Sequence, residues 1–173
     1  MRRPILIHPD PRLKKVCDAV PDISDEIRAL AGEMLDTMYE APGIGLAAPQ
    51  VGVNLRMLVM DCAQREETET NRPMCLINPE IIWSADEVSE YEEGCLSIPE
   101  IFANVTRPKA VTVRYLDRDG EVQEETFENT WAVCVQHEID HLDGKLFIDY
   151  LSPMRRRMIT SKMQKLKRER ARG

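Results

Sequence analysis

The sequence lacks the features that would place the chain in a membrane or in a disulfide-stabilised fold. No apolar run reaches roughly 18 residues, the length that a transmembrane helix needs. The first residues are basic but no long apolar segment follows them, so we expect no signal peptide. The five cysteines are an odd number and are scattered, which favours reduced thiols in the cytoplasm. Repeats and low-complexity tracts are also missing, so residues 1–173 are predicted to form a single domain without membrane contact.

Charge is unevenly distributed along the chain. The formal net charge is −7, but residues 155–173 alone carry nine Lys or Arg and one acid, or +8, which leaves −15 for the rest. Ser152-Pro153 is typical of a helix start, since serine caps a helix and proline fits its first turn. Residues 152–173 are therefore predicted to form a basic C-terminal helix with an electrostatic partner of its own. Its apolar stripe, expected to dock on the body, is made of Met154, Met158, Ile159, Met163 and Leu166.

Histidine is rare, and two of the three histidines lie in one short motif, Gln136-His137-Glu138-Ile139-Asp140-His141. Residues four apart share one face of an α-helix, so His137 and His141 can bind one metal ion. Glu138 points about 100° further round the helix, which suits a general base that is not a ligand. The surrounding residues predict a helix from near Asn129 to Gly144 that is apolar on several sides and therefore central and buried.

The usual third ligand of such a motif is missing downstream. A catalytic metal typically has three protein ligands and one open position, but the place of a third histidine is taken by Phe147 and the only later glutamate, Glu169, lies in the basic tail. His8 is expected in a loop near the N-terminus. The best upstream candidate is Cys95 in Glu93-Gly94-Cys95-Leu96-Ser97, where a glycine permits close backbone approach. With the two histidines it would bind Fe(II), Zn(II), Co(II) or Ni(II).

The rest of the pattern predicts a mixed fold. Apolar residues at helical spacing from Ile27 to Met38 indicate a helix that starts at Asp22 or Ser24 and ends before Pro42-Gly43. Residues 5–20 are expected to form a short strand and a loop, and residues 62–73 an exposed loop. Strands are predicted over residues 55–60, 74–77, 80–84, 110–116 and 121–127, with a turn at 78–79. The fold class is α+β, with short, mostly antiparallel strands packed around the central metal-binding helix and a C-terminal helix.

Three motifs in order produce a specific resemblance to a known family. Gly43-Ile44-Gly45-Leu46-Ala47-Ala48-Pro49-Gln50, the Cys95 motif and the His137 motif resemble the three signature motifs of peptide deformylase, over a region from Ile5 to about Tyr150. The resemblance implies a cytoplasmic, metal-dependent hydrolase that removes the N-formyl group from the first methionine of newly made proteins and releases formate. It also implies Fe(II) as the native ion, formyl-methionyl nascent peptides as substrates, and ribosomal RNA as partner of the basic helix. We expect a monomer.

The resemblance also assigns roles to individual residues. It makes Cys95, His137 and His141 the metal ligands and Glu138 the general base. The side chain of Gln50 and the backbone N–H of Leu96 would stabilise the oxyanion. Ile44, Val133 and Cys134 are the candidates for the pocket that holds the methionine side chain, and Gly45 and Gly94 are expected to contact the substrate as well. Thr130-Trp131 stands where the family often has leucines.

Two other functions are compatible with the helix motif. A metallopeptidase would share it but needs the downstream ligands that this chain lacks. A non-catalytic, ribosome-associated protein would hold a structural metal with Cys134 as a fourth ligand, one turn before His137 on the same face. Four protein ligands would leave no position for water.

Overall fold

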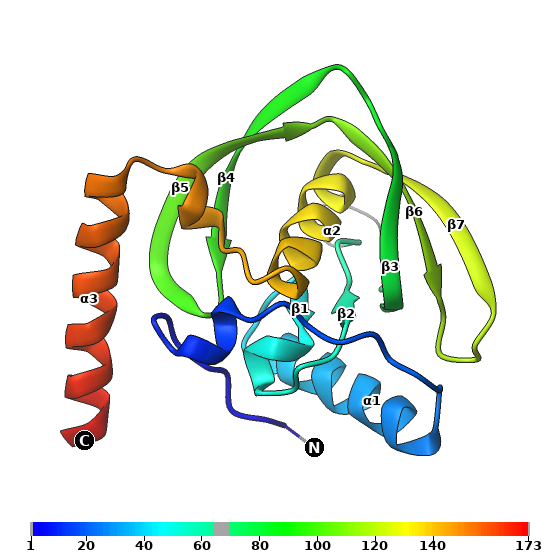
Figure 1. Ribbon diagram of the computed structural model, residues 1–173, viewed down its shortest axis with the longest axis horizontal. Helices are drawn as coiled ribbons and strands as arrows, with labels where there is room; N and C mark the ends of the chain where they lie inside the picture. The colour runs from blue at the N-terminus through cyan, green and yellow to red at the C-terminus, as the bar shows by residue number, and fades with distance from the viewer. Residues whose placement is uncertain (1, 64–69, 173) are drawn as a thin grey trace.

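The computed structural model describes residues 2–63 and 70–172, and its α+β architecture is built around one helix (Figure 1). α2 (Asn129–Leu142) lies in the centre, between a five-stranded sheet and a two-stranded ribbon. The sheet has the order β1-β2-β3-β6-β7, and every pairing in it is antiparallel. The predicted fold class is thereby confirmed.

The strands of the five-stranded sheet are β1 (Gly45–Ala47), β2 (Met57–Met60), β3 (Met74–Ser84), β6 (Ala110–Leu116) and β7 (Val122–Glu128). The ribbon pairs β4 (Val88–Cys95) with β5 (Ile98–Pro108). Short 3-10 helices occupy Pro11–Lys14, Ala48–Val51 and Phe147–Tyr150. The predicted exposed loop over residues 62–73 lies partly outside the described residues, at 64–69.

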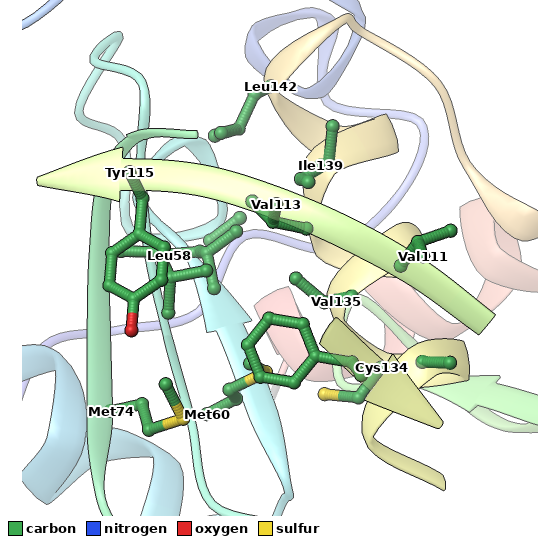
Figure 2. Packing of buried hydrophobic residues seen from close by; sticks show 14 of the residues in the cluster. Leu58, Met60, Met74, Val111, Val113, Tyr115, Cys134, Val135, Ile139 and Leu142 are labelled. Carbon is green, nitrogen blue, oxygen red and sulfur yellow. The ribbon is translucent and has the colours of Figure 1, made fainter. Parts of the chain in front are cut away.

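The sheet is covered on both faces at β2 and β3. Alternate side chains of a strand point to opposite faces, and Leu58 and Met60 pack with Val135 and Ile139 of α2 (Figure 2). Their strand neighbours pack instead with α1 (Asp25–Glu40), in a second core cluster that includes Met34. All four residues of β2 are buried, which explains why the strand has a continuous apolar sequence rather than an alternating one.

The ends of α1 and α2 follow from their sequence. Ser24 caps α1, and its Oγ accepts a hydrogen bond of 3.3 Å from the N–H of Ile27. α2 ends two residues before Gly144, which has a φ of +75°. A Cβ at Gly144 would lie 2.5 Å from the carbonyl oxygen of Lys14, so both the left-handed conformation and the close approach require glycine.

Two strand predictions need correction, and some strands were not predicted. The described residues in 5–20 contain no strand, only the Pro11–Lys14 3-10 helix and an isolated bridge at Asp18. β3 continues through Asn78-Pro79 as an irregular stretch rather than turning there. The side chain of Asn78 stabilises this kink, because it accepts a hydrogen bond of 2.8 Å from the N–H of Val20 and donates one of 3.0 Å to its carbonyl. The strands β1, β4 and β5 were not predicted.

α3 (Pro153–Arg172) packs beside β5 at the edge of the molecule, away from the five-stranded sheet (Figure 1). Ile159 and Met163 are buried there, together with Phe147. Met154 and Met158 are 66% and 67% exposed, so their expected docking is wrong. Met158 lies about 100° round the helix from Ile159, off the face that packs. None of the helices among the described residues is long and apolar enough to cross a membrane.

Candidate active site

Three potential metal ligands converge from two elements. His137 and His141 lie on one face of α2, and Cys95 is the last residue of β4. Their ligand atoms all lie within 4.8 Å of one another, and the Sγ of Cys95 is 3.4 Å from the Nε2 of His141. Both histidines are buried. The predicted ligand set is therefore a single compact group in the structure.

The chemistry of this group fits a divalent transition metal ion. A thiolate with two imidazoles is a donor set that suits Fe(II), Zn(II), Co(II) and Ni(II). The Nδ1 of His137 lies 3.0 Å from a carboxylate oxygen of Glu93, so Nε2 is the ring nitrogen that could bind a metal ion. A carboxylate behind a ligating histidine is the usual way in which proteins orient the ring toward a metal.

Glu93 belongs to a buried ion network that the sequence analysis did not assign. Arg107 donates two hydrogen bonds to Glu93, of 2.7 and 3.0 Å, and a third of 2.9 Å to Asp140 of α2. Both Glu93 and Arg107 are at most 5% exposed. Burial alone would raise the pKa of Glu93, but its hydrogen bonds with His137 and Arg107 outweigh burial and hold the pKa below its usual value. The sequence could have indicated a role for Glu93, because it precedes Cys95 by two residues. Residues two apart on a strand point to the same face.

Glu138 is buried beside the ligand group without belonging to it. It is 5% exposed, and its Oε1 has no hydrogen-bond partner among the residues that the structure describes. Burial raises the pKa of Glu138 to about 7, although the charge of His137 opposes this shift. A Cβ at Gly45 would lie 2.6 Å from both the Oε2 of Glu138 and the Sγ of Cys134. Glycine at position 45 thus lets the backbone of β1 lie against the carboxylate.

The side-chain amide of Gln50 has a defined orientation. Its Oε1 accepts a hydrogen bond of 2.9 Å from the N–H of Ala47. Its Nε2 donates a hydrogen bond of 3.0 Å to the Oγ of Ser97 and lies 3.5 Å from the Sγ of Cys95. The donor end of the amide therefore points toward the ligand group. Ser97 is a further residue without a predicted role, and it helps to hold Gln50 in this position.

A cavity of about 750 Å³ opens beside these groups. Every residue predicted to contact substrate lines it, namely Ile44, Gly45, Gln50, Gly94, Leu96, Val133, Cys134 and Glu138, and so do Cys95, His137 and Thr130. Trp131 is not among the lining residues and stacks on Phe127 at a ring distance of 6.4 Å. Cys134 lies outside the group of potential ligands, and its Sγ is 3.6 Å from the carbonyl oxygen of Ile44.

Comparison with known proteins agrees with this geometry. The profile of the polypeptide deformylase family matches residues 2–157. A peptide deformylase of Mesorhizobium japonicum is 53% identical over 171 residues, which cover 99% of this chain and 96% of that protein. One of Methylocella silvestris is 52% identical over 164 residues, covering 94% and 84%.

Solved structures show the same likeness. The crystal structure of a peptide deformylase from Legionella pneumophila superposes with a TM-score of 0.91 at 45% identity and covers 100% of this chain and 99% of that one. The peptide deformylase from Ehrlichia chaffeensis in complex with actinonin has a TM-score of 0.91 at 39% identity, covering 96% and 98%. The chain belongs to the polypeptide deformylase family, the hydrolases that remove the N-formyl group from nascent peptides.

Proposed function

We propose that this chain performs the family's hydrolysis with Glu138 as its general acid–base residue. The buried carboxylate supports this role most strongly, because its Oε1 has no protein partner in the described part of the chain while its helix neighbours are the two histidines. Glu138 takes a proton from the attacking water and delivers it to the leaving amine, so that formate and a free N-terminus are the products.

Cys95, His137 and His141 hold the metal ion in this proposal. A divalent ion bound there supplies Lewis acidity and lowers the pKa of a water molecule. We propose Fe(II) as the native ion, with Zn(II), Ni(II) and Co(II) as ions that the same donor set accepts. Glu93 orients His137 through its Nδ1, and Arg107 keeps the charge of Glu93 compensated in the buried environment.

Gln50 and Leu96 stabilise the developing negative charge. The amide of Gln50 suits this role because Ala47 and Ser97 restrain it, so little reorganisation accompanies the reaction. The backbone N–H of Leu96, the residue after Cys95, is the second donor. The methionine side chain of the substrate occupies the part of the cavity lined by Ile44, Val133 and Cys134, and Gly45 and Gly94 contact the substrate from the same cavity.

The basic face of α3 is a second point of contact with the translation machinery. Most of its Lys and Arg side chains are exposed, whereas Ile159 and Met163 attach the helix to the body. We propose that this face binds ribosomal RNA, because an acidic body with one strongly basic helix directs that helix toward phosphates. We also propose that the enzyme is cytoplasmic and monomeric.

Formate release tests the proposed reaction. The metal-loaded protein is incubated with formyl-Met-Ala-Ser and, separately, with an unformylated peptide of the same sequence. We expect formate and a new free amine from the first and no cleavage of the second. Cleavage of an internal peptide bond without formate would instead support a metallopeptidase.

A further inference from the structure

A second cavity, of about 490 Å³, lies between the N-terminal segment, the Phe147–Tyr150 3-10 helix and the first half of α3. Among the described residues, its lining shares no member with that of the active-site cavity. The catalytic roles assigned above therefore use none of its groups. The polar and charged side chains that matter here are His8, Lys14, Asp149, Arg156, Arg157 and Ser161.

The two arginines of this lining have no acidic partner. Among the residues that the structure describes, Arg156 and Arg157 form no ion pair, and Arg156 is half-buried. The lining carboxylate of Asp149 accepts hydrogen bonds of 3.1 and 3.3 Å from the Nζ of Lys14 and one of 2.9 Å from the N–H of Leu146. Its charge is thus matched by Lys14. Partial burial of an uncompensated guanidinium costs free energy, and an anion in the cavity would lower this cost.

His8 forms a buried part of the cavity wall. It is 5% exposed, and its Nε2 lies 2.8 Å from the Oγ of Thr160. Its Nδ1 has no hydrogen-bond partner among the described residues. Buried polar atoms without a partner are uncommon in proteins. This nitrogen therefore indicates a polar group at the cavity that the protein itself does not supply.

The electrostatic environment of His8 is positive. Burial is the main cause that lowers the pKa of His8 to about 4. The charges of Lys14 and Lys167 lower this pKa further, and the charge of Asp149 opposes them. Surroundings that disfavour a positive charge on the imidazole favour a negative charge nearby.

We propose that this cavity is a binding site for a phosphate group, held by Arg156 and Arg157 with the hydroxyl of Ser161 as a further donor. The planar guanidinium matches two phosphate oxygens at once, which makes arginine well suited to this group. Arg157 and Ser161 lie four residues apart on α3 and are therefore neighbours on its surface. The inference does not depend on deformylation. A free phosphorylated molecule and an RNA backbone present the same oxyanion, and the experiment distinguishes these two sources.

The test follows backbone amide resonances of the full-length, zinc-loaded protein during titration with inorganic phosphate. Ionic strength is held at about 0.15 M, where charges further apart than about 8 Å are largely screened. The variant is Arg156→Gln/Arg157→Gln. Its control, Lys165→Gln/Arg168→Gln, removes two exposed charges from the same helix, roughly 12–18 Å further along its axis.

In the wild type and the control, the amides of Lys14, Ile148 and Ser161 should shift and reach saturation. The Arg156→Gln/Arg157→Gln variant should raise the Kd for phosphate at least about ten-fold, because it loses charge-assisted hydrogen bonds. Equal affinity in all three proteins, or shifts that never saturate, would overturn the inference. Shifts confined to Gly45 and Leu96 would do the same, since they would place the phosphate at the active site.

A short RNA strand identifies the source of the phosphate group. Displacement of the bound strand by inorganic phosphate, together with weaker RNA binding in Arg156→Gln/Arg157→Gln, would assign the group to an RNA backbone. Phosphate binding without such displacement would assign it to a free phosphorylated molecule. Absence of phosphate binding at the cavity would overturn the inference whatever the RNA does.

Discussion

A carboxylate oxygen of Glu93 lies 3.0 Å from the Nδ1 of His137, and this contact connects the ligand group to the buried Arg107 network. The two residues come from different elements, β4 and α2. The contact sets both the tautomer and the ring orientation of His137, because a neutral imidazole that donates from Nδ1 offers the lone pair of Nε2 to a ligand.

Replacing Glu93 should therefore weaken metal binding. Glu93→Gln removes the negative charge that holds the Nδ1 proton, and we expect metal affinity to fall roughly 10- to 100-fold. The measurement is competition with a chelator of known affinity. Glu92→Gln, at the exposed neighbouring position, is the matched control and should retain wild-type affinity.

Glu138→Ala should retain the metal and lose the reaction. A general acid–base residue typically contributes about 10²–10⁴ in rate, and Glu138 is not one of the three converging ligands. Elemental analysis and kcat for formate release are measured on the same preparation. A rate that simply tracked a reduced metal content would mean that Glu138 is structural. Glu26→Ala, on the exposed start of α1, controls for the loss of a carboxylate.

The two cysteines of the cavity should behave differently. Cys95→Ser should sharply lower the bound metal, since an alcohol is a far poorer ligand than a thiolate. Cys134→Ser should retain about one metal per chain, because Cys134 is not part of the converging group. Loss of metal from Cys134→Ser alone would contradict this ligand assignment and favour a closed, four-ligand site.

His8 should make stability depend on pH. Burial and the charge of Lys14 lower the pKa of His8 to about 4, with Lys167 acting in the same direction and Asp149 opposing it. The unfolded chain instead takes up this proton near pH 6.5. The free energy of unfolding should therefore decrease as pH falls from about 6.5 to about 4, by up to about 3 kcal/mol.

His8→Gln should reduce this dependence, because glutamine does not titrate. In the wild-type protein the Nε2 of His8 lies 2.8 Å from the Oγ of Thr160, and the polar amide of glutamine is chosen to replace this hydrogen bond. Urea unfolding at pH 7.5, 5.5 and 4.5 gives the difference between the two proteins. Since other groups titrate equally in both, parallel curves would show that His8 is not the responsible group.

The basic face of α3 should control ribosome binding. Changing Lys162, Lys165 and Arg168 to glutamine removes three exposed charges and leaves the buried Ile159 and Met163 in place. Co-sedimentation with ribosomes should weaken, and its dependence on salt should become shallower by about one phosphate contact per charge removed. Lys109→Gln, outside α3, is the control. Equal sedimentation of all forms would refute the contact, and formate release from a short peptide should persist throughout.

The sequence alone was sufficient to predict the central helix and the face of it that carries His137 and His141. Spacing of four residues between His137 and His141 is a local property, and the same is true of the Ser24 cap and the apolar face of α1. The hairpin of β6 and β7 was predicted because its connecting turn and its alternating residues lie close together in the chain. The assignment of Cys95 as third ligand used the motifs, and the structure brings it to the histidines.

Strands whose sequence breaks the apolar alternation were not predictable in this way. In β5 the inward positions Ala103 and Val105 are followed by Arg107, a charge that is buried because Glu93 and Asp140 compensate it. A hydrophobicity pattern counts arginine as an exposed polar residue. The alternation of buried positions in β5 therefore cannot be recognised at Arg107. The continuity of β3 through Asn78 likewise depends on a partner 58 residues away, Val20.

Only the tertiary structure decided which groups support and border the site. The pairing of Gly94 with Phe102, the contact of Glu93 with His137 and the approach of Gly45 to Glu138 all join segments distant in the sequence. Helical spacing is determined by bonds between near neighbours, so it can be derived from the chain alone. Strand register and the docking of a ribbon on a helix depend on the packing of the whole core, because shifting a strand by one residue would turn every side chain to the other face.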